Sequence, residues 1–594
     1  MKRNKFNVAL LVVLIGFCRS RLSAQQIVNS GCDVGPTATY PMTPDIATYP
    51  MSSDQYAVQY KLGGEAGWTD AHVYISKYGE TEASPYRSDS GYTVGETSMS
   101  FVSIPADSNT YVQLRVTLLS GSPAPGPIPF LESDNVSVRP SVKRIGADLM
   151  YDGTVQISTS TPSDFAGEQF VLMWNRSKTK GGGIQGLAFF LNPIYKTPKG
   201  PNVKVITSSD DLTGNLTNYD TLVFEGTVAI EPIPPAADGG IAGAGVFQVP
   251  LNIYNIYLAP GAWVQGKFFF QPTADVDGHL RTISGPGVLD VSRFQYNLRS
   301  CGSGSNYPDE GLDALSSLAG FSLDTFDLDG IIISDTNHAA TFPLFNSTVN
   351  NVKTISWNGV NAGLKLEDGT TASNVFVRSG DDSLMMWGSN ITVTNATVWQ
   401  NYNGGVVNLG WSNNSTGDYC LIDGLYVVKT DWLTPTAADI TFNMGPTFAL
   451  SDQNNAVIAS MMVPGTEFGA TQPSLYKNIF VEDAPQVLFS LKILPPDCDL
   501  TSFDAGCPVP VDLTQSSTLK LNIENLFTPP SIEQNSIGFE TLDGYTNPVG
   551  MSLPPVYTLT GNMNISLTNV FVAGKIVTTG DNVNVEHKVD EGIF

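Results

Sequence analysis

Two neighbouring carboxylates, Asp381 and Asp382, follow a glycine in the stretch Arg378-Ser-Gly-Asp-Asp-Ser-Leu. Adjacent acids have coupled protonation, because ionising one carboxyl group opposes ionising the other. A pair whose pKa values are separated in this way can supply the general acid and general base that hydrolysis of a glycosidic bond requires. An Asp-Asp pair after glycine is also a common turn, so the surrounding segments must decide between chemistry and structure.

Polar and aromatic residues flank the pair, upstream in 361–369 and downstream in 402–411. If repeats stack these segments side by side, their side chains line one face beside the acids. Aromatic rings there could act as platforms for sugars, although Trp387 and Trp411 could equally be core residues. The candidate substrate-binding residues are Asn361, Lys365, Trp387, Tyr402, Asn408 and Trp411.

A short phrase of Asn or Asp followed by apolar residues recurs in the second half of the chain. The first intervals between phrases are 23, 21 and 28 residues, which suits one coil of a parallel β-helix. The later intervals of 55, 47 and 44 residues predict about two coils each. A β-propeller is the rival repeat fold, but its longer four-stranded blades fit less well. The phrases begin at Asn351, Asn374, Asn395, Asp423, Asn478, Asn525 and Asn569.

The chain divides into three regions, and the predicted class is all-β. Residues 1–24 combine a basic start, an apolar run too short to span a bilayer and small residues for cleavage. They predict a signal peptide and a secreted, extracellular product without a membrane anchor. Residues 25–207 alternate polar and apolar side chains between turn-rich stretches, which predicts an N-terminal β-sandwich. We expect residues 208–594 to form a right-handed parallel β-helix.

The composition is acidic, with 56 Asp and Glu against 31 Lys and Arg and a formal net charge of −25. Removing the basic signal peptide would lower this charge to about −30. Phosphate or carboxylate ligands would be repelled, so nucleic acids and anionic polymers such as pectate are disfavoured. A neutral polysaccharide is the compatible partner, and a glycan-decorated acidic body is most simply a monomer.

Sequons and cysteines agree with export. Of the six cysteines, Cys18 lies in the signal peptide, which leaves an odd number. Cys498 and Cys507, in a Pro-rich loop, are the best candidates for a disulfide. No cysteines have the spacing of a zinc site and the four histidines are scattered, so no metal or cofactor is expected. Nine sequons, which predict a glycoprotein, begin at Asn135, Asn175, Asn215, Asn346, Asn390, Asn395, Asn413, Asn414 and Asn564.

Three stretches, 257–267, 283–289 and 374–411, carry a resemblance that covers most of the mature chain. The chain resembles glycoside hydrolase family 49, the dextranases and isopullulanases. This resemblance implies a β-sandwich joined to a right-handed β-helix, and endo-acting, inverting hydrolysis of neutral α-glucans of the dextran or pullulan type. It also implies that Asp381 is the general acid on the glycosidic oxygen and that Asp382 helps to activate water.

Four polar positions depart from the family pattern. The third family carboxylate falls on Ala362, an acidic position on Lys365, a lysine on Met385 and a histidine on Tyr402. Losing one water-activating carboxylate removes a contribution of about 10²–10⁴-fold in rate. The alternative function is therefore a catalytically impaired relative that binds glycan or serves as a structural extracellular glycoprotein.

Two further possibilities stay open. Glu367 or Asp368 could replace the missing acid, although strand alternation would place one of them on each face. Lyase chemistry is a weaker third alternative, because it would need a Ca²⁺ cluster and a basic residue beside the site.

Overall fold

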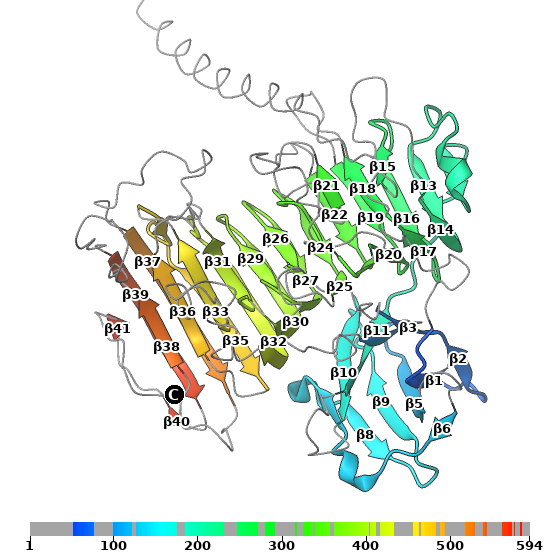
Figure 1. Ribbon diagram of the computed structural model, residues 1–594, viewed down its shortest axis with the longest axis horizontal. Coiled ribbons are helices and arrows are strands. Elements are labelled where there is room, and N and C mark those ends of the chain that lie inside the picture. Colours follow the sequence, from blue (N-terminus) through cyan, green and yellow to red (C-terminus); the bar gives the residue numbers. More distant parts are fainter. Residues whose placement is uncertain are drawn as a thin grey trace, which may run out of the picture.

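The structure is a computed structural model, and its described residues are all-β with three short 3₁₀ turns. A smaller body, coloured blue to cyan, lies against one side of an elongated body, coloured green to red (Figure 1). No helix among the described residues is long and apolar enough to cross a membrane. The predicted signal peptide, 1–24, and both Cys498 and Cys507 lie outside the described residues. These residues are 52–76, 99–120, 126–174, 185–230, 246–270, 280–291, 315–317, 325–336, 339–356, 362–402, 404–411, 416–432, 456–462, 465–482, 487–493, 517–528, 538–542, 561–572, 575–576 and 583–584.

The smaller body is the predicted β-sandwich. Its strands are β1 (Tyr56–Leu62), β2 (Thr69–Ala71), β3 (Val73–Ile75), β4 (Ser100–Pro105), β5 (Tyr111–Leu119), β6 (Pro127–Ile128), β7 (Ser137–Arg139), β8 (Gly146–Leu149), β9 (Val155–Ser160), β10 (Glu168–Trp174) and β11 (Gln185–Asn192), with η3 (Glu132–Asp134) and η4 (Ser141–Lys143) between them. One sheet has the order β2-β1-β5-β9-β8, with β6 beside β5, and the other has the order β3-β4-β11-β10-β7. In β5 every second side chain is buried, so Val112, Leu114 and Val116 fill the space between the sheets.

The elongated body is a parallel β-helix, so the predicted fold class is confirmed. Its strands follow two sides of each coil in a 21-stranded sheet and the third side in sheets of three and six strands. Val264, Leu289 and Ile333 come from three successive coils, Val377 and Val398 from two further ones after the coil of Thr354, and all five join the buried core. Parallel stacking thus keeps equivalent positions of neighbouring coils side by side.

The β-helix begins with β12, and η5 (Ser209–Leu212) follows it. The strands are β12 (Val203–Ile206), β13 (Thr221–Phe224), β14 (Thr227–Ala229), β15 (Val246–Val249), β16 (Asn255–Leu258), β17 (Trp263–Gln265), β18 (Lys267–Phe270), β19 (Leu280–Ser284), β20 (Val288–Asp290), β21 (Leu315–Ser317), β22 (Thr325–Asp329), β23 (Ile332–Ser334), β24 (Thr348–Asn350), β25 (Lys353–Ile355), β26 (Leu364–Leu366), β27 (Thr371–Ser373), β28 (Phe376–Ser379), β29 (Leu384–Met386), β30 (Thr392–Tyr402), β31 (Val407–Trp411), β32 (Leu421–Trp432), β33 (Ile458–Met462), β34 (Glu467–Phe468), β35 (Ser474–Val481), β36 (Val487–Ile493), β37 (Ser517–Phe527), β38 (Gly538–Leu542), β39 (Gly561–Val572), β40 (Lys575–Ile576) and β41 (Val583–Asn584).

One corner of the coil is held by stacked asparagines. Asn374, Asn395, Asn478, Asn525 and Asn569 all have positive φ between 52° and 56°, the left-handed conformation that Asn tolerates better than most residues. The Nδ2 of Asn569 donates to the Oδ1 of Asn525 (3.2 Å), and the Nδ2 of Asn525 donates in turn to the Oδ1 of Asn478 (3.1 Å). Asn395 donates to Asn374 in the same way, so the amide of this sequon is committed to the ladder.

The later coils are longer than the sequence predicts. β32 pairs directly with β35, β35 with β37, and β37 with β39. The intervals of 55, 47 and 44 residues therefore each span one coil, and the prediction of about two coils each is wrong. Long connections between strands lengthen the interval without adding a coil, and spacing alone cannot separate the two cases.

Apolar side chains join the sandwich to the β-helix in one buried cluster. Phe190 of the sandwich meets Phe376 of β28 edge to face, with ring centroids 5.2 Å apart. Tyr74 stacks on Trp263 of β17 with centroids 5.3 Å apart. The sandwich therefore covers the apolar outer side of the coils that lead into the Asp381 turn.

A buried lysine lies in the same interface. Lys353 of β25 is fully buried and donates to the Oδ1 of Asn192, at the end of β11, and to the carbonyl of Gly330 at 3.1 Å. Burial holds the pKa of Lys353 well below its usual range, and the Asp329 carboxylate opposes this shift. Asn351 donates to the same Asn192 oxygen at 3.0 Å.

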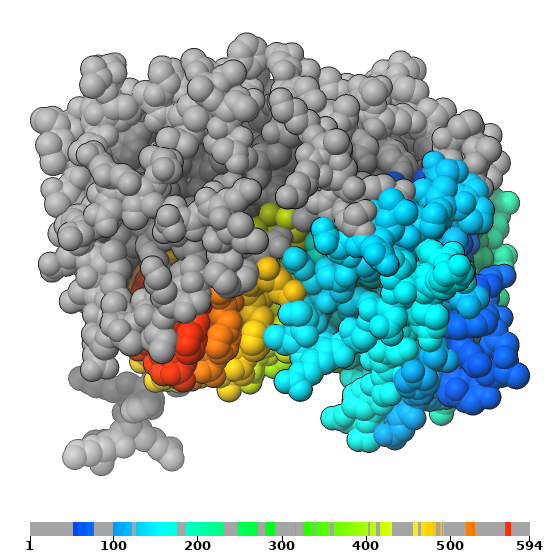
Figure 2. All heavy atoms as spheres, turned by 90° about the horizontal axis from the view of Figure 1, so that it is seen from below, coloured from blue at the N-terminus to red at the C-terminus, as the bar shows by residue number. Residues whose placement is uncertain are grey.

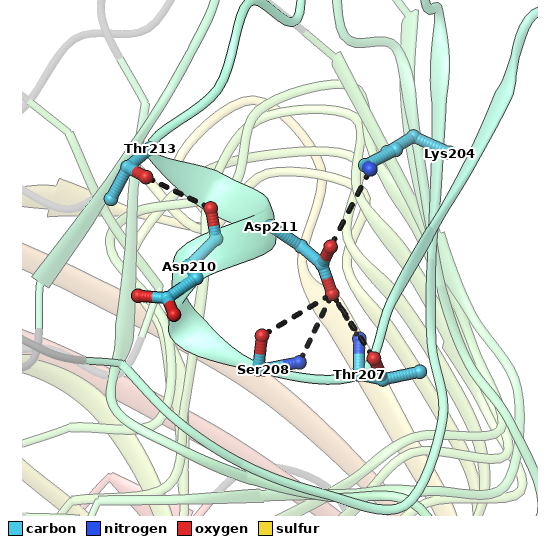
Figure 3. A network of polar contacts seen from close by, with 6 residues as sticks. All are labelled: Lys204, Thr207, Ser208, Asp210, Asp211 and Thr213. Atoms are coloured by element: carbon cyan, nitrogen blue, oxygen red, sulfur yellow. Dashed lines mark hydrogen bonds and ion pairs between the residues drawn. The ribbon is translucent and has the colours of Figure 1, made fainter.

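A capped turn follows the first strand of the β-helix (Figure 3). The Asp211 carboxylate accepts hydrogen bonds from the backbone N–H (3.2 Å) and hydroxyl (3.5 Å) of Ser208, and lies 3.5 Å from the Lys204 ammonium. Hydrogen bonds from backbone N–H groups lower the pKa of Asp211. The cap orients η5 so that Leu212 joins the apolar core.

A row of stacked rings runs along the last coils. Tyr426, Phe480, Phe527 and Phe571 have successive centroid separations of 5.7, 5.2 and 5.3 Å, with nearly parallel ring planes. Lys143 of the sandwich lies 5.4 Å over the Tyr426 ring. Figure 2 shows these coils, yellow to red, running away beside the cyan sandwich. Each aromatic pair is worth about 0.5–1.5 kcal/mol beyond its buried area, so the stack reinforces the register of the later coils.

Candidate active site

The three segments grouped by the sequence lie on three consecutive coils. β26, β29 and β31 are neighbours in the six-stranded sheet, and Lys365, Met385 and Asn408 share one register position. The residues beside them, such as Leu364 and Leu384, point into the core, so this row faces outward. Asp381 and Asp382 occupy the turn that enters the middle strand.

Asp382 is a buried carboxylate with both oxygens bound by the protein. Only 6% of the residue is exposed. Its Oδ1 accepts the backbone N–H of Gly405 at 2.7 Å, and its Oδ2 accepts the Nδ2 of Asn408 at 2.6 Å. Burial raises the pKa of Asp382 to about 6, and the hydrogen bonds from Asn408 and Gly405 limit the increase.

Asp381 is half-buried, and its backbone is fixed by neighbouring polar groups. Its Oδ1 accepts the backbone N–H of Asp382 at 2.9 Å. Its carbonyl accepts the Ser379 hydroxyl at 2.7 Å and the Gln400 amide at 2.8 Å. The Ser383 hydroxyl donates to the Oε1 of Gln400 at 2.6 Å and so links the turn to the next coil. The two acids thus differ in environment, which is the condition for separate roles.

Asn408 joins the indole of Trp387 to the carboxylate. The Oδ1 of Asn408 accepts the Nε1–H of Trp387 at 3.1 Å and the backbone N–H of Gly410 at 2.8 Å. Asn408 is fully buried, whereas Trp387 is half-buried. A chain of hydrogen bonds therefore runs from the indole through the amide to Asp382.

An apolar group occupies position 362, where the resemblance predicts a third carboxylate. The pairing of Leu364 with Leu384 places Ala362, two residues earlier, beside Asp382, and the Gly363 N–H donates to the Asp382 carbonyl at 2.8 Å. Ala362 is 8% exposed and belongs to an apolar cluster whose other members are Ala339 and Met385, with Trp387 packed against them. No acid of the described residues lies at this point of the row.

Glu367 and Asp368 do not fill that gap. Ala362 lies beside Asp382, and Glu367 follows it by five residues, which is about 16 Å along an extended strand. Glu367 is therefore farther from the acid pair than the roughly 6.5–9.5 Å that separates the carboxyl groups of inverting enzymes. Burial and then the Asp368 charge raise the pKa of Glu367 to about 7, and Lys365 opposes the shift. The exposed Asp368 carboxylate accepts the Ser389 N–H at 2.6 Å.

Of the other predicted site residues, the structure describes Lys365 fully and Tyr402 and Trp411 in their backbone. Lys365 is 5% exposed and lies in the outward row. Tyr402 ends β30 and Trp411 ends β31, where the structure describes the backbone, and Asn361 lies outside the described residues. In the described part of the chain, no group of three or more His, Cys, Asp or Glu is arranged to hold a metal, and Cys420 is a buried free thiol.

Gly404 is a site residue whose role the sequence does not reveal. Its φ is +78°, and an added Cβ would lie 2.5 Å from the Oδ1 of Asp381 and 2.4 Å from the N of Asp382. The Gly-Gly pair signals a turn in the sequence, but only the stacking of coils brings that turn against the acids. Gly404 therefore leaves the room in which the two carboxylates sit.

Gly404→Ala should lower the apparent melting temperature more than Gly261→Ala, measured by circular dichroism. Gly261 is a matched control because its φ is +76° and nothing lies within 4 Å of an added Cβ. Both variants bear the strain of a left-handed residue, about 1–2 kcal/mol, but only Gly404→Ala also pushes on the acid turn. Equal losses in the two variants would contradict the close approach.

The chain is similar to several known carbohydrate-active proteins. No protein-family model matches it. It is 29% identical to a dextranase of Arthrobacter sp. (strain CB-8) over 194 residues, 31% of this chain and 29% of that protein. It is 29% identical to an isopullulanase of Aspergillus niger over 321 residues, 50% and 53% of the two chains. It is 22% identical to a dextranase of Talaromyces minioluteus over 493 residues, 73% and 75% of the two chains.

The match spans less than a third of the Arthrobacter dextranase and about half of the isopullulanase. The solved structure of Dex49A from Penicillium minioluteum superposes with a TM-score of 0.61 and 18% identity, covering 89% of this chain and 90% of that one. At this identity the likeness shows the fold. The chain is therefore similar in sequence, at low identity, to dextranases and an isopullulanase, and it shares the fold of Dex49A.

Proposed function

We propose that the protein is a secreted, monomeric glycoside hydrolase that cleaves neutral α-glucans of the dextran or pullulan type with inversion. Asp381 protonates the glycosidic oxygen as the C–O bond breaks, while Asp382 accepts a proton from the water that attacks the anomeric carbon. The step leaves Asp381 ionised and Asp382 protonated, so after the products depart, proton exchange with solvent returns a proton to Asp381 and removes the one on Asp382.

The observation that carries this proposal is the contrast between the two acids. Asp382 is buried with both oxygens accepting hydrogen bonds, yet each oxygen keeps a lone pair for a water proton. Asp381 is half-buried beside it, on a turn fixed by Ser379 and Gln400. Two carboxyls held in different environments support an acid and a base at one site.

The substrate class rests on charge and on the relatives. The net charge of −25 disfavours anionic polymers, and the matched proteins are named dextranase and isopullulanase. Trp387, Tyr402 and Trp411 are proposed as sugar platforms, with Asn361 and Lys365 as polar contacts. No cofactor takes part in the proposed reaction.

A second candidate function is glycan binding without hydrolysis, or a structural role outside the cell. It is favoured by the apolar cluster of Ala339, Ala362 and Met385 at the position of the third family acid. An apolar wall beside Asp382 cannot hydrogen-bond an attacking water, so this candidate predicts a groove that retains sugar and does not cleave it.

Release of reducing sugar from dextran, pullulan and starch separates the two functions. We expect release from at least one glucan, abolition by Asp381→Asn and no change in Asp210→Asn, whose carboxylate is exposed near the start of the β-helix. Binding of the same glucan should survive Asp381→Asn. Binding by the unmodified protein with no release from any glucan would favour the second function.

The pH dependence tests the role of Asp382. A base must be ionised, and its pKa is raised to about 6, so kcat/KM should fall as pH decreases through about 6. Below that point the expected slope is about tenfold per pH unit. A rate that stays constant down to pH 4 would exclude Asp382 as the base.

Restoring the missing acid provides a gain-of-function test. Ala362→Asp places a carboxyl beside Asp382 and should raise the hydrolytic rate by about 10²-fold or more. Because position 362 is 8% exposed and next to Met385, the variant should also melt at a lower temperature. Ala362→Asn, similar in shape but without a base, is the matched control and should give no gain.

A further inference from the structure

The protein uses three of the four hydrogen-bonding positions of the Asn408 side chain, both at Oδ1 and one of the two N–H groups of Nδ2. Its Oδ1 accepts two donors, the Trp387 Nε1–H at 3.1 Å and the Gly410 N–H at 2.8 Å, while its Nδ2 donates to Asp382 at 2.6 Å. A reversed amide would set its NH₂ against two N–H donors and its oxygen against a carboxylate. Only one orientation satisfies all three contacts.

We propose that Asn408 is a positioning residue for Asp382, held in its orientation by the Trp387 indole N–H, rather than a direct ligand of the sugar. The inference rests on the proposed function, because positioning matters for catalysis only if Asp382 is the base. It also assigns two roles to the Trp387 side chain: the indole N–H is bonded to Asn408, and only the face of the ring can contact a substrate.

Few charged groups lie near enough to Asp382 to influence its ionisation alongside the Asn408 amide. Charged groups on the elements around Asp382 are Asp381 in the same turn, Arg378 on β28, and Lys365 and Glu367 on the preceding coil. β31 carries none. Arg378 donates to the carbonyl of Ser356 at 2.8 Å. The groups that oppose the effect of burial on the Asp382 pKa are Asn408 and Gly405, both uncharged donors.

Removal of the amide should therefore make Asp382 easier to protonate. Asn408 donates to the ionised carboxylate, and a hydrogen bond to the charged form favours that form. Without this hydrogen bond, less opposes the increase that burial causes in the pKa of Asp382. Trp387→Phe keeps an aromatic ring but frees the Asn408 oxygen from one of its two donors, so its effect should have the same direction and a smaller size.

The test is the titration of Asp382 in the full-length protein without substrate, followed by ¹³C NMR of aspartate labelled at Cγ. The resonance is the one absent from Asp382→Asn. In Asn408→Ala the midpoint should rise by about one pH unit, a tenfold tighter binding of the proton. Asn202→Ala is the matched control, because Asn202 donates to Asp220 at 3.2 Å on an exposed surface, and it should leave the midpoint unchanged.

The outcomes separate this inference from the proposed function. An unchanged or lowered midpoint in folded Asn408→Ala overturns it, and if that variant does not fold, an unchanged midpoint in Trp387→Phe does the same. In an active enzyme, a positioning role predicts that Asn408→Ala shifts the acid limb of the pH profile of kcat/KM to higher pH, with little change in KM. A higher KM with the limb unmoved would make Asn408 a sugar ligand. If no glucan is cleaved, the hydrolase proposal fails while the titration still decides the role of Asn408.

Discussion

The register between neighbouring coils is the constraint on which the rest of the structure depends. The later coils turn at a left-handed residue, which is Asn except for Gly424 on the coil of β32, and the Asn side chains bond along the body to one another or, at that coil, to Asp423. A slip of one residue would break that ladder and would also move every apolar side chain of a strand from the core to the outside. The same register brings the Gly404 turn against Asp381, and Asn408 within reach of Asp382. The position of the acids therefore depends on the register held at the Asn corner, which lies at the other end of β28.

Around the acids the protein balances two opposing electrostatic effects. Burial disfavours the charged form of Asp382, whereas donors on the next coil favour it. On the other side of Asp382 the contacts are apolar, because Ala362 of the preceding coil packs against Met385 of the same coil as the acids. The side of Asp382 that faces the next coil is thus polar, and the side that faces Ala362 is apolar.

Much of the fold follows from local patterns, because alternation and spacing are properties of short segments. Alternation predicts strands such as β5, and the recurring Asn phrases predict the stacked coils. The length of the later coils could not be predicted, since a long connection and an extra coil give the same interval. The acid pair and the absence of an acid at Ala362 are visible in the sequence. The role of Gly404 and the apolar cluster around Ala362 are not, because both arise from pairing between residues of different coils.

The buried Lys353 has a consequence for how the two bodies can be separated. Its ammonium is held by Asn192, which belongs to the sandwich, while Lys353 itself belongs to the β-helix. Separating the two bodies at the connection between β11 and β12, residues 193–202, would leave the cation without that acceptor and would expose the rings of Trp263 and Phe376 to water. Recombination at this boundary would therefore have to exchange both halves of the contact at once, because a buried charge left without its partner is strongly destabilising.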